Sequence, residues 1–155
     1  IKNIIIDPGH GGIILGVYTT QGKSYKFPNG EIAYEGVINR NISKALGNKL
    51  KSNGFNVIYT VDPSDPNDIS LGERVRKANR YSSKDSVFVS IHNNAMGKPG
   101  TARGFEIFQI WIENSDKLAE SIYNEVAKLY NKLNLKLRYD FSDKDYDKEA
   151  GFYVI

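Results

Sequence analysis

The chain has 155 residues, which suits one domain, and 40% hydrophobic and 12% aromatic residues are enough to build a sizeable core. It contains no cysteine, which excludes disulfides, thiol nucleophiles and cysteine zinc sites and leaves histidine, aspartate and glutamate as the strong metal ligands. The formal net charge of +3 is mildly basic without a nucleic-acid-binding motif, so we expect no nucleic-acid partner, whereas an anionic polymer is compatible with this charge.

The first predicted element is a short strand close to the amino end. Residues 4–6 are uniformly apolar and β-branched, which is typical of a buried strand in a mostly parallel sheet. The chain begins inside this strand without a signal-peptide pattern, so we interpret it as a domain without its targeting segment. No apolar stretch approaches the roughly 20 residues that span a bilayer, and we expect no membrane insertion.

Residues 13–34 are predicted to form a long loop. Glycine, proline and asparagine are interspersed there with aromatic residues, a composition that favours a loop over a regular element. Long loops within compact domains are often functional. The aromatic residues Tyr18, Tyr25, Phe27 and Tyr34 leave two interpretations open, because aromatics in a loop either bind a ligand or pin the loop to the domain.

An amphipathic helix is predicted from Glu35 to just before Gly54. Its apolar positions recur at helical spacing, and they are Ile38, Ile42, Ala45, Leu46 and Leu50. A strand over residues 56–60 and turn material over residues 62–68 follow.

A second helix is predicted from Ser70 to about Tyr81. Ser70 and Glu73 have the spacing of a capping box at its start. The densest positive run of the chain lies on this helix, and we interpret it as an ordinary solvated face. Its members are Arg74, Arg76, Lys77 and Arg80.

The remaining elements complete an α/β pattern. Strands are predicted over residues 87–92 and 104–112, a long helix from near Ser115, a solvated charged loop over residues 139–149, and a last strand from Phe152. The helix stripe consists of Leu118, Ile122, Val126, Leu129 and Leu133. Alternating strands and helices predict a single α/β domain with a mostly parallel twisted sheet flanked by helices.

The two histidines of the chain each follow an apolar strand. His10 comes after the first strand and His92 after the third. Open α/β sheets place their ligand sites outside the carboxyl ends of their strands, so we expect the two imidazoles to meet there. Two histidines and one carboxylate are a common zinc ligand set in hydrolases, with the fourth position left to water.

Glu35 is the best candidate for the third ligand. It opens the helix after the long loop, and that helix end faces the same sheet edge in a right-handed crossover, with Glu31 as the near competitor. Asp7, Asn93 and Asn94 are candidates for orienting the imidazoles. Each residue alone also has a structural interpretation, since a histidine after a strand or an acid at a helix start needs no metal. Convergence on one sheet edge favours a site for one zinc ion.

Four segments, in order along nearly the whole chain, resemble the zinc-dependent N-acetylmuramoyl-L-alanine amidases. They are Ile5-Ile6-Asp7-Pro8-Gly9-His10-Gly11-Gly12, Glu35-Gly36-Val37-Ile38-Asn39-Arg40, Ser70-Leu71-Gly72-Glu73-Arg74 with Ala78-Asn79, and Ser90-Ile91-His92-Asn93-Asn94-Ala95. The resemblance implies His10, Glu35 and His92 as zinc ligands and hydrolysis of the amide between N-acetylmuramic acid and L-alanine in peptidoglycan. It implies action at the bacterial cell wall, as a secreted or periplasmic autolysin or a phage lysin, and we expect a monomer.

The resemblance departs from the family at the carboxyl end. The family's proton-handling glutamate lies on a strand after the one that begins here at Phe152, which implies that this residue lies beyond Ile155 and that the domain of residues 1–155 is truncated. Glu106 is a weak catalytic candidate, because strand alternation places it on the same face as Phe108, where an acid needs a partner or a purpose. Glu149 is expected to face solvent.

Two other functions stay open from the sequence. One is a zinc-stabilised wall-binding module that is catalytically incomplete. The other is a different zinc peptidase on a similar fold, since two histidines and a glutamate also serve peptide hydrolysis.

Overall fold

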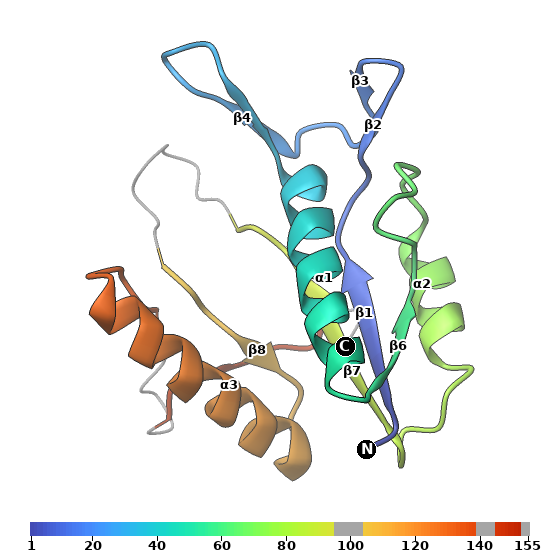
Figure 1. The fold of residues 1–155 in the computed structure, drawn as a ribbon, viewed down its shortest axis with the longest axis vertical. Coiled ribbons are helices and arrows are strands. Elements are labelled where there is room, and N and C mark those ends of the chain that lie inside the picture. Colours follow the sequence, from blue (N-terminus) through green and yellow to red (C-terminus); the bar gives the residue numbers. More distant parts are fainter. Residues whose placement is uncertain (95–103, 139–144, 153–155) are drawn as a thin grey trace. The chain divides into compact units, whose positions relative to one another are not determined.

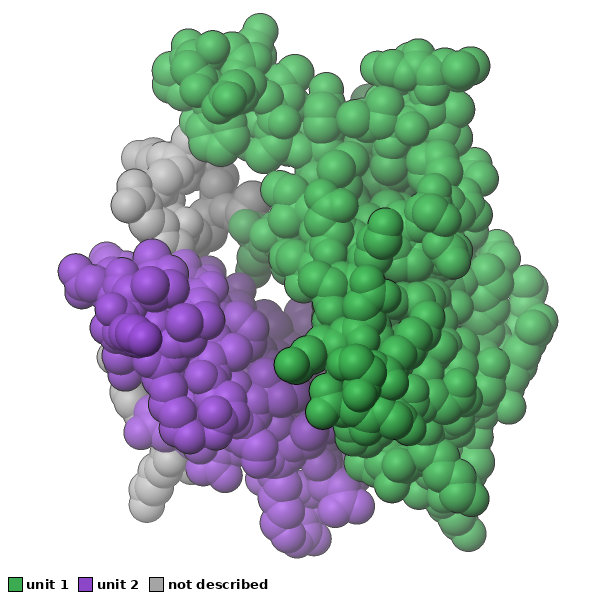
Figure 2. Space-filling model, viewed as in Figure 1, with its two compact units in different colours: residues 1–94, 154 green, residues 95–153, 155 purple. Residues whose placement is uncertain are grey.

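The computed structural model describes residues 1–94, 104–138 and 145–152, which fall into two compact units (Figure 2). Unit 1 comprises residues 1–94, and unit 2 comprises the described residues from 104 onward. Parallel strands and helices confirm the predicted α/β class. None of the helices in the described part of the chain combines the length and the apolar character of a membrane span.

The centre of unit 1 is a three-stranded parallel sheet. Its strands lie in the order β6 (Asn56–Tyr59), β1 (Asn3–Pro8) and β7 (Ser86–Ile91), and all three strands predicted for this region are confirmed. Ile5 of the central strand lies opposite Ile58 on one side and Phe88 on the other. The buried β-branched run of β1 therefore forms the core of this unit, and β1 and β7 end side by side.

Helix α1 (Glu35–Ser52) packs against the sheet through small and polar residues. Its buried residues are Gly36, Asn39, Arg40, Ser43 and Gly47, whereas Ile42 of the predicted apolar stripe is 46% exposed. A Cβ atom added at Gly36 would lie 1.8 Å from the carbonyl oxygen of Gly11, and one at Gly47 would lie 1.8 Å from the Tyr59 hydroxyl. The helix backbone thus approaches the sheet too closely for larger side chains.

Helix α2 (Leu71–Ala78) is capped by Ser70, which is one half of the predicted capping box: its hydroxyl oxygen accepts a hydrogen bond from the Glu73 backbone amide at 3.2 Å. The predicted solvated face is wrong for Arg74, which is 2% exposed. Its guanidinium turns inward because acid and carbonyl acceptors lie at the end of β1. Arg76 and Arg80 are exposed as expected.

Residues 13–34 form two antiparallel hairpins instead of the predicted long loop. They are β2 (Ile13–Ile14) with β3 (Val17–Tyr18), and β4 (Ser24–Lys26) with β5 (Ile32–Tyr34). Leu15 and Gly16 have φ values of 48° and 81°, the left-handed conformation that closes a two-residue hairpin turn. Figure 1 shows both hairpins projecting beyond the carboxyl end of β1.

Unit 2 is built around helix α3 (Glu113–Lys132) and a two-stranded parallel sheet of β8 (Phe108–Gln109) and β9 (Lys148–Glu149). Ala119 and Tyr123 are its buried residues on α3, while Leu129 and Leu133 of the predicted stripe are more than half exposed. The strand predicted over residues 104–112 is mostly wrong, because only two of its residues pair with β9.

The prediction of a solvated loop over residues 139–149 is wrong for its described part, residues 145–149. Residues 139–144 lie outside the described part of the chain, but Asp147 is fully buried and residues 148–149 form β9. The Tyr146 ring stacks on the Tyr123 ring at 5.1 Å, which anchors this charged segment to α3. Phe152 is not in a strand, and the rest of the predicted last strand lies outside the described residues.

Candidate metal centre

The structure brings His10, Glu35 and His92 together, and we refer to these three residues as the histidine cluster. His10 follows β1, Glu35 is the first residue of α1, and His92 follows β7. Their ligand atoms all lie within 4.8 Å of one another. His10 Nε2 is 3.2 Å and His92 Nδ1 is 3.1 Å from the same Glu35 oxygen, Oε1, so both imidazoles face one carboxylate.

The turn after β1 is shaped to admit the second imidazole. A Cβ atom added at Gly9 would lie 2.3 Å from the His92 ring, so only glycine leaves room for that ring. The Gly9 amide donates a hydrogen bond to the Ile91 carbonyl at 3.0 Å, which ties the ends of β1 and β7 together. His10 itself has a φ of 64°, an uncommon conformation for a residue with a side chain.

Glu35 is ionised in this setting. Burial acts to raise the pKa of its carboxyl, but hydrogen bonds with His10 and His92 oppose that effect and hold the pKa well below its usual range. Its side chain is 12% exposed, compared with 43% for His92. The cluster therefore offers an anionic oxygen at its base and an open side at His92.

Two asparagines support this carboxylate. The backbone N–H of Asn93 donates to Glu35 Oε1 at 3.2 Å, and Asn93 Nδ2 donates to Asn39 Oδ1 at 2.7 Å. Asn39 Nδ2 in turn donates to the Gly9 carbonyl at 3.0 Å. Asn93 thus contacts the carboxylate rather than an imidazole, and Asn94 follows it in the same segment. Asn39 was not predicted, although its polar side chain one helical turn after Glu35, on a helix that faces the sheet edge, is a signal.

Two buried arginines hold the turn that carries His10. Both Arg40 Nη1 and Arg74 Nη2 donate to the His10 carbonyl. Arg40 also donates to the carbonyls of Asp65 and Asn67, each at 2.9 Å. Burial lowers the pKa of Arg40, with the neighbouring Arg74 acting in the same direction. Sequence analysis assigned neither arginine to the site.

Asp7 supports the turn from beneath. It is fully buried, and its carboxylate accepts hydrogen bonds from Arg74 Nη1 at 2.8 Å, from Ser90 at 2.8 Å and from Thr60. Arg74 Nη1 also donates to the Pro8 carbonyl at 2.8 Å. The link of Asp7 to the histidine cluster therefore runs through Arg74, not through the direct orientation of an imidazole that the sequence suggested.

The other acidic candidates have partners of their own. Glu31 is exposed and accepts a hydrogen bond from Asn29 at 2.8 Å, away from the cluster. In unit 2, the Glu106 side chain is 9% exposed and forms ion pairs with Lys148 at 3.0 Å and with Arg138 at 3.4 Å, which supplies the partner that a buried acid needs. Glu149 is half-buried in β9, so the expectation that it faces solvent is wrong.

The four aromatic residues of the hairpins divide between the two interpretations. The Tyr18 hydroxyl oxygen accepts from the Gly36 amide at 2.9 Å, and its ring lies 4.7 Å from that of Tyr34, so this pair pins the hairpins to α1. Tyr25 and Phe27 contact each other at 5.0 Å and are 41% and 44% exposed.

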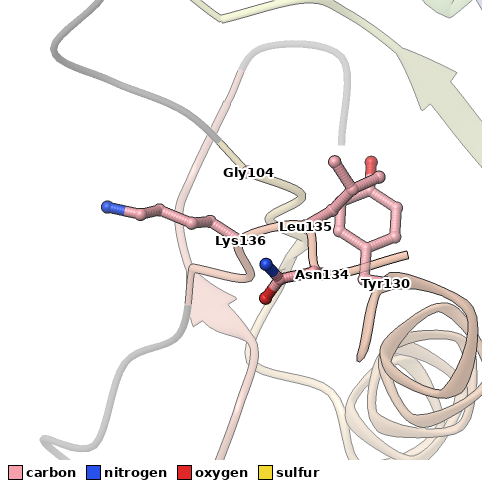
Figure 3. A pocket seen from close by; sticks show the side chains of 5 residues that line it. All are labelled: Gly104, Tyr130, Asn134, Leu135 and Lys136. Carbon is pink, nitrogen blue, oxygen red and sulfur yellow. The ribbon is translucent and has the colours of Figure 1, made fainter. Parts of the chain in front are cut away.

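Unit 2 contains a pocket of about 350 Å³ lined by Gly104, Tyr130, Asn134, Leu135 and Lys136. Figure 3 shows Leu135 beside the Tyr130 ring and Lys136 extending away from it. The lining includes none of the predicted site residues and no acid, so the histidine cluster is the better candidate for chemistry.

The donor set of the histidine cluster fits a zinc ion. Two imidazole nitrogens and one carboxylate oxygen are a common catalytic zinc set, and zinc sites in hydrolases keep a further position open. The exposure of His92 provides that open side. Hydrogen bonds at Asn93 and at the His10 backbone supply the supporting contacts that metal sites use to fix their ligands.

Comparisons with known proteins identify a matching family model. The family model described as N-acetylmuramoyl-L-alanine amidase (Amidase_3) matches residues 4–155. A search of the curated proteins gives no match.

Several solved structures are similar over almost the whole chain. The N-acetylmuramoyl-L-alanine amidase AmiC2 of Nostoc punctiforme has a TM-score of 0.72 at 26% identity, covering 99% of this chain and 72% of that chain. An N-acetylmuramoyl-L-alanine amidase from Clostridium difficile 630 has a TM-score of 0.70 at 26% identity, covering 99% and 71%. The catalytic domain of CwlV from Bacillus (Paenibacillus) polymyxa var. colistinus has a TM-score of 0.66 at 25% identity, covering 100% and 73%.

Proposed function

This chain belongs to the N-acetylmuramoyl-L-alanine amidase family, and from that premise we propose that it holds one zinc ion with His10, Glu35 and His92. The reaction is hydrolysis of the amide bond between N-acetylmuramic acid and L-alanine in peptidoglycan. One observation supports the zinc proposal. Three ligand atoms, which belong to three segments far apart in sequence, lie within 4.8 Å of one another.

Zinc is favoured over calcium and magnesium by the types of ligand. Two imidazoles and one carboxylate suit zinc, whereas calcium and magnesium prefer oxygen ligands alone. When bound, zinc supplies Lewis-acid chemistry, because it polarises a carbonyl and makes water a better nucleophile near neutral pH.

The protein's own residues prepare the site for that ion. The ionised Glu35 already orients both imidazoles, so little rearrangement is needed on binding. Arg40 and Arg74 fix the backbone of His10, and Asn93 fixes the carboxylate. The exposed side of His92 leaves space for a polymeric substrate to approach.

We place the action of the enzyme at the bacterial cell wall, as a monomer, where an autolysin and a phage lysin would use the same chemistry. The wall-binding module and the zinc peptidase are not favoured, because the family model runs over residues 4–155 and the similar structures are amidases.

The test combines zinc content with the release of alanine amino groups from purified peptidoglycan. We expect the zinc-loaded chain to contain one zinc ion and to release amino groups, and the chelator-stripped chain or a His92→Ala variant to release none. Release that is unchanged after stripping would contradict the zinc proposal. Zinc bound one to one without any release would keep the metal site but refute hydrolysis by this chain.

A further inference from the structure

Unit 2 contains a second group of potential metal ligands, which we call the aspartate cluster. Asp116 lies in the first turns of α3, and Asp145 and Asp147 lie just before β9. Their carboxylate oxygens approach within 4.8 Å of one another. Acidic groups often gather on protein surfaces without a ligand, so the proximity alone decides nothing.

The second observation is the state of Asp147. This residue is 0% exposed, and neither oxygen of its carboxylate has a hydrogen-bond partner among the described residues. One of its oxygens lies within 4.8 Å of a carboxylate oxygen of Asp116 and of Asp145. Buried polar groups are almost always hydrogen-bonded, and a buried carboxylate without a partner is among the costliest exceptions. Such a group needs a ligand or a proton.

Two described lysines that neighbour the cluster in sequence are paired with other acids. Lys117, next to Asp116 in sequence, lies 2.6 Å from Glu113. Lys148, next to Asp147, lies 3.0 Å from Glu106. Among the described residues, the two lysines next to Asp116 and Asp147 are therefore engaged by acids outside the cluster.

The electrostatic surroundings of Asp147 also disfavour the ionised form of its carboxyl. Burial raises the pKa of its carboxyl to about 6, and Asp145, Asp116 and Glu149 act in the same direction, whereas its own backbone N–H acts in the opposite direction. A bound cation would reverse this effect, because it favours the ionised form of every acid that coordinates it.

Packing, not attraction between the acids, holds the cluster together. The Tyr146 ring stacks on Tyr123 of α3, and β9 is joined to β8 through backbone bonds and the 2.9 Å hydrogen bond from Gln109 to Glu149. These contacts lie on both sides of Asp147. The fold thus holds three acids near one point in spite of their mutual repulsion, which is the arrangement of a cation site.

We propose that Asp116, Asp145 and Asp147 bind a calcium ion that fastens the segment before β9 to α3. An all-oxygen ligand set selects a hard cation rather than zinc. Calcium accepts six to eight oxygens in irregular geometry, so water can complete a site that has three carboxylates, whereas magnesium demands near-octahedral geometry. This site is independent of the histidine cluster, which contains two nitrogens.

The test is calorimetric titration of calcium chloride into the zinc-loaded full chain. We expect one calcium ion to bind in addition to zinc, with a Kd below about 1 mM, the range of extracellular calcium modules. Asp147→Asn and Asp116→Asn should each weaken binding by about tenfold or more, since each removes a charged ligand. Glu125→Gln is the matched control, because its carboxylate lies on α3 and pairs with Lys128 at the surface. No binding up to about 10 mM, or equal binding by the aspartate variants, would overturn the proposal.

A thermal measurement separates a cation site from a buried acid that is simply protonated. At about a hundredfold excess of calcium over Kd, the melting temperature of the wild type should rise by about 5 °C, and that of Asp147→Asn should not change. A wild type that is indifferent to calcium, together with an Asp147→Asn variant that is more stable without it, would favour the protonated acid and refute the site. Asp116→Asn, at a partly exposed position, repeats the test if Asp147→Asn does not fold.

Discussion

The histidine cluster of unit 1 and the aspartate cluster of unit 2 each gather three potential metal ligands, but their surroundings differ. In unit 1, one carboxylate lies between two imidazoles and accepts a backbone hydrogen bond from Asn93. In unit 2, three carboxylates face one another, and both oxygens of Asp147 have no hydrogen-bond partner among the described residues.

This difference shows two ways to prepare a metal site. Where neutral or positive groups balance the carboxylate, the ligands hold their geometry before the ion arrives. Where like charges face one another, the arrangement depends on external packing, and the ion itself contributes to stability. The two clusters should therefore respond differently to mutation and to pH.

Replacement of Arg74 should have the largest effect on the stability of unit 1. Arg74→Met leaves the buried Asp7 carboxylate without its ion pair, and breaking a buried pair typically costs about 3–5 kcal/mol. Arg76→Met on the same helix is the matched control, because that side chain is 67% exposed and should change stability by less than about 0.5 kcal/mol. Urea denaturation measures both. Equal stability of the two variants would show that Arg74 does not stabilise the turn of His10.

Neutralisation of Glu35 should reduce zinc affinity. Glu35→Gln removes the anionic ligand and the group that orients both imidazoles, so we expect a loss of about 100-fold or more in zinc affinity. Glu31→Gln neutralises the neighbouring candidate, which is exposed, and should bind zinc like the wild type. Competition with a chromogenic chelator gives both affinities. A loss of zinc affinity in Glu31→Gln, with wild-type affinity in Glu35→Gln, would identify Glu31 as the third ligand.

The two clusters should respond to pH in opposite directions. The pKa of Glu35 is lowered in the folded state, so its contribution to stability is present above the unfolded pKa near 4.5 and is lost as the pH falls. The pKa of Asp147 is raised from 3.8 to about 6, so its folded form favours the proton, and stability declines as the pH rises from about 4 through 6.

The Asp147 effect can be measured in metal-free protein. We expect this residue to cost about 2 kcal/mol of unfolding free energy between pH 4 and pH 7, and Asp147→Asn to remove that decline. Urea denaturation across this range, with calcium absent, gives the two slopes. Parallel slopes for wild type and variant would show that Asp147 titrates as an ordinary exposed acid.

The sequence was sufficient to predict the histidine cluster because its signals are local. An apolar strand followed by a histidine marks a strand end, and the alternation of elements places such ends at one sheet edge. Three residues that support the cluster were missed, because Asn39, Arg40 and Arg74 act through tertiary contacts with backbone groups distant in sequence. Arg74 in particular is a charged residue of a type usually found at the surface, but it lies in the core.

Unit 2 was less predictable because its elements depend on partners. Residues 104–112 have a strand pattern, but a strand forms only where another segment pairs with it, and β9 pairs with two residues. The segment before β9 was interpreted as solvated because it is charged, although the stacking of Tyr146 on Tyr123 buries part of it. No pattern within that segment indicates such an anchor.

The smallest effect concerns the hairpins beside the histidine cluster. Tyr18→Phe removes the hydroxyl that accepts the Gly36 amide, next to Glu35, and should cost about 1 kcal/mol of unfolding free energy because the helix start loses a hydrogen bond. Tyr25→Phe removes a hydroxyl from an exposed ring and should leave stability unchanged. Denaturation of both variants, with zinc affinity measured in parallel, separates anchoring from exposure. If Tyr25→Phe costs as much as Tyr18→Phe, both aromatic pairs pin the hairpins, and the exposure of Tyr25 does not free it for ligand binding.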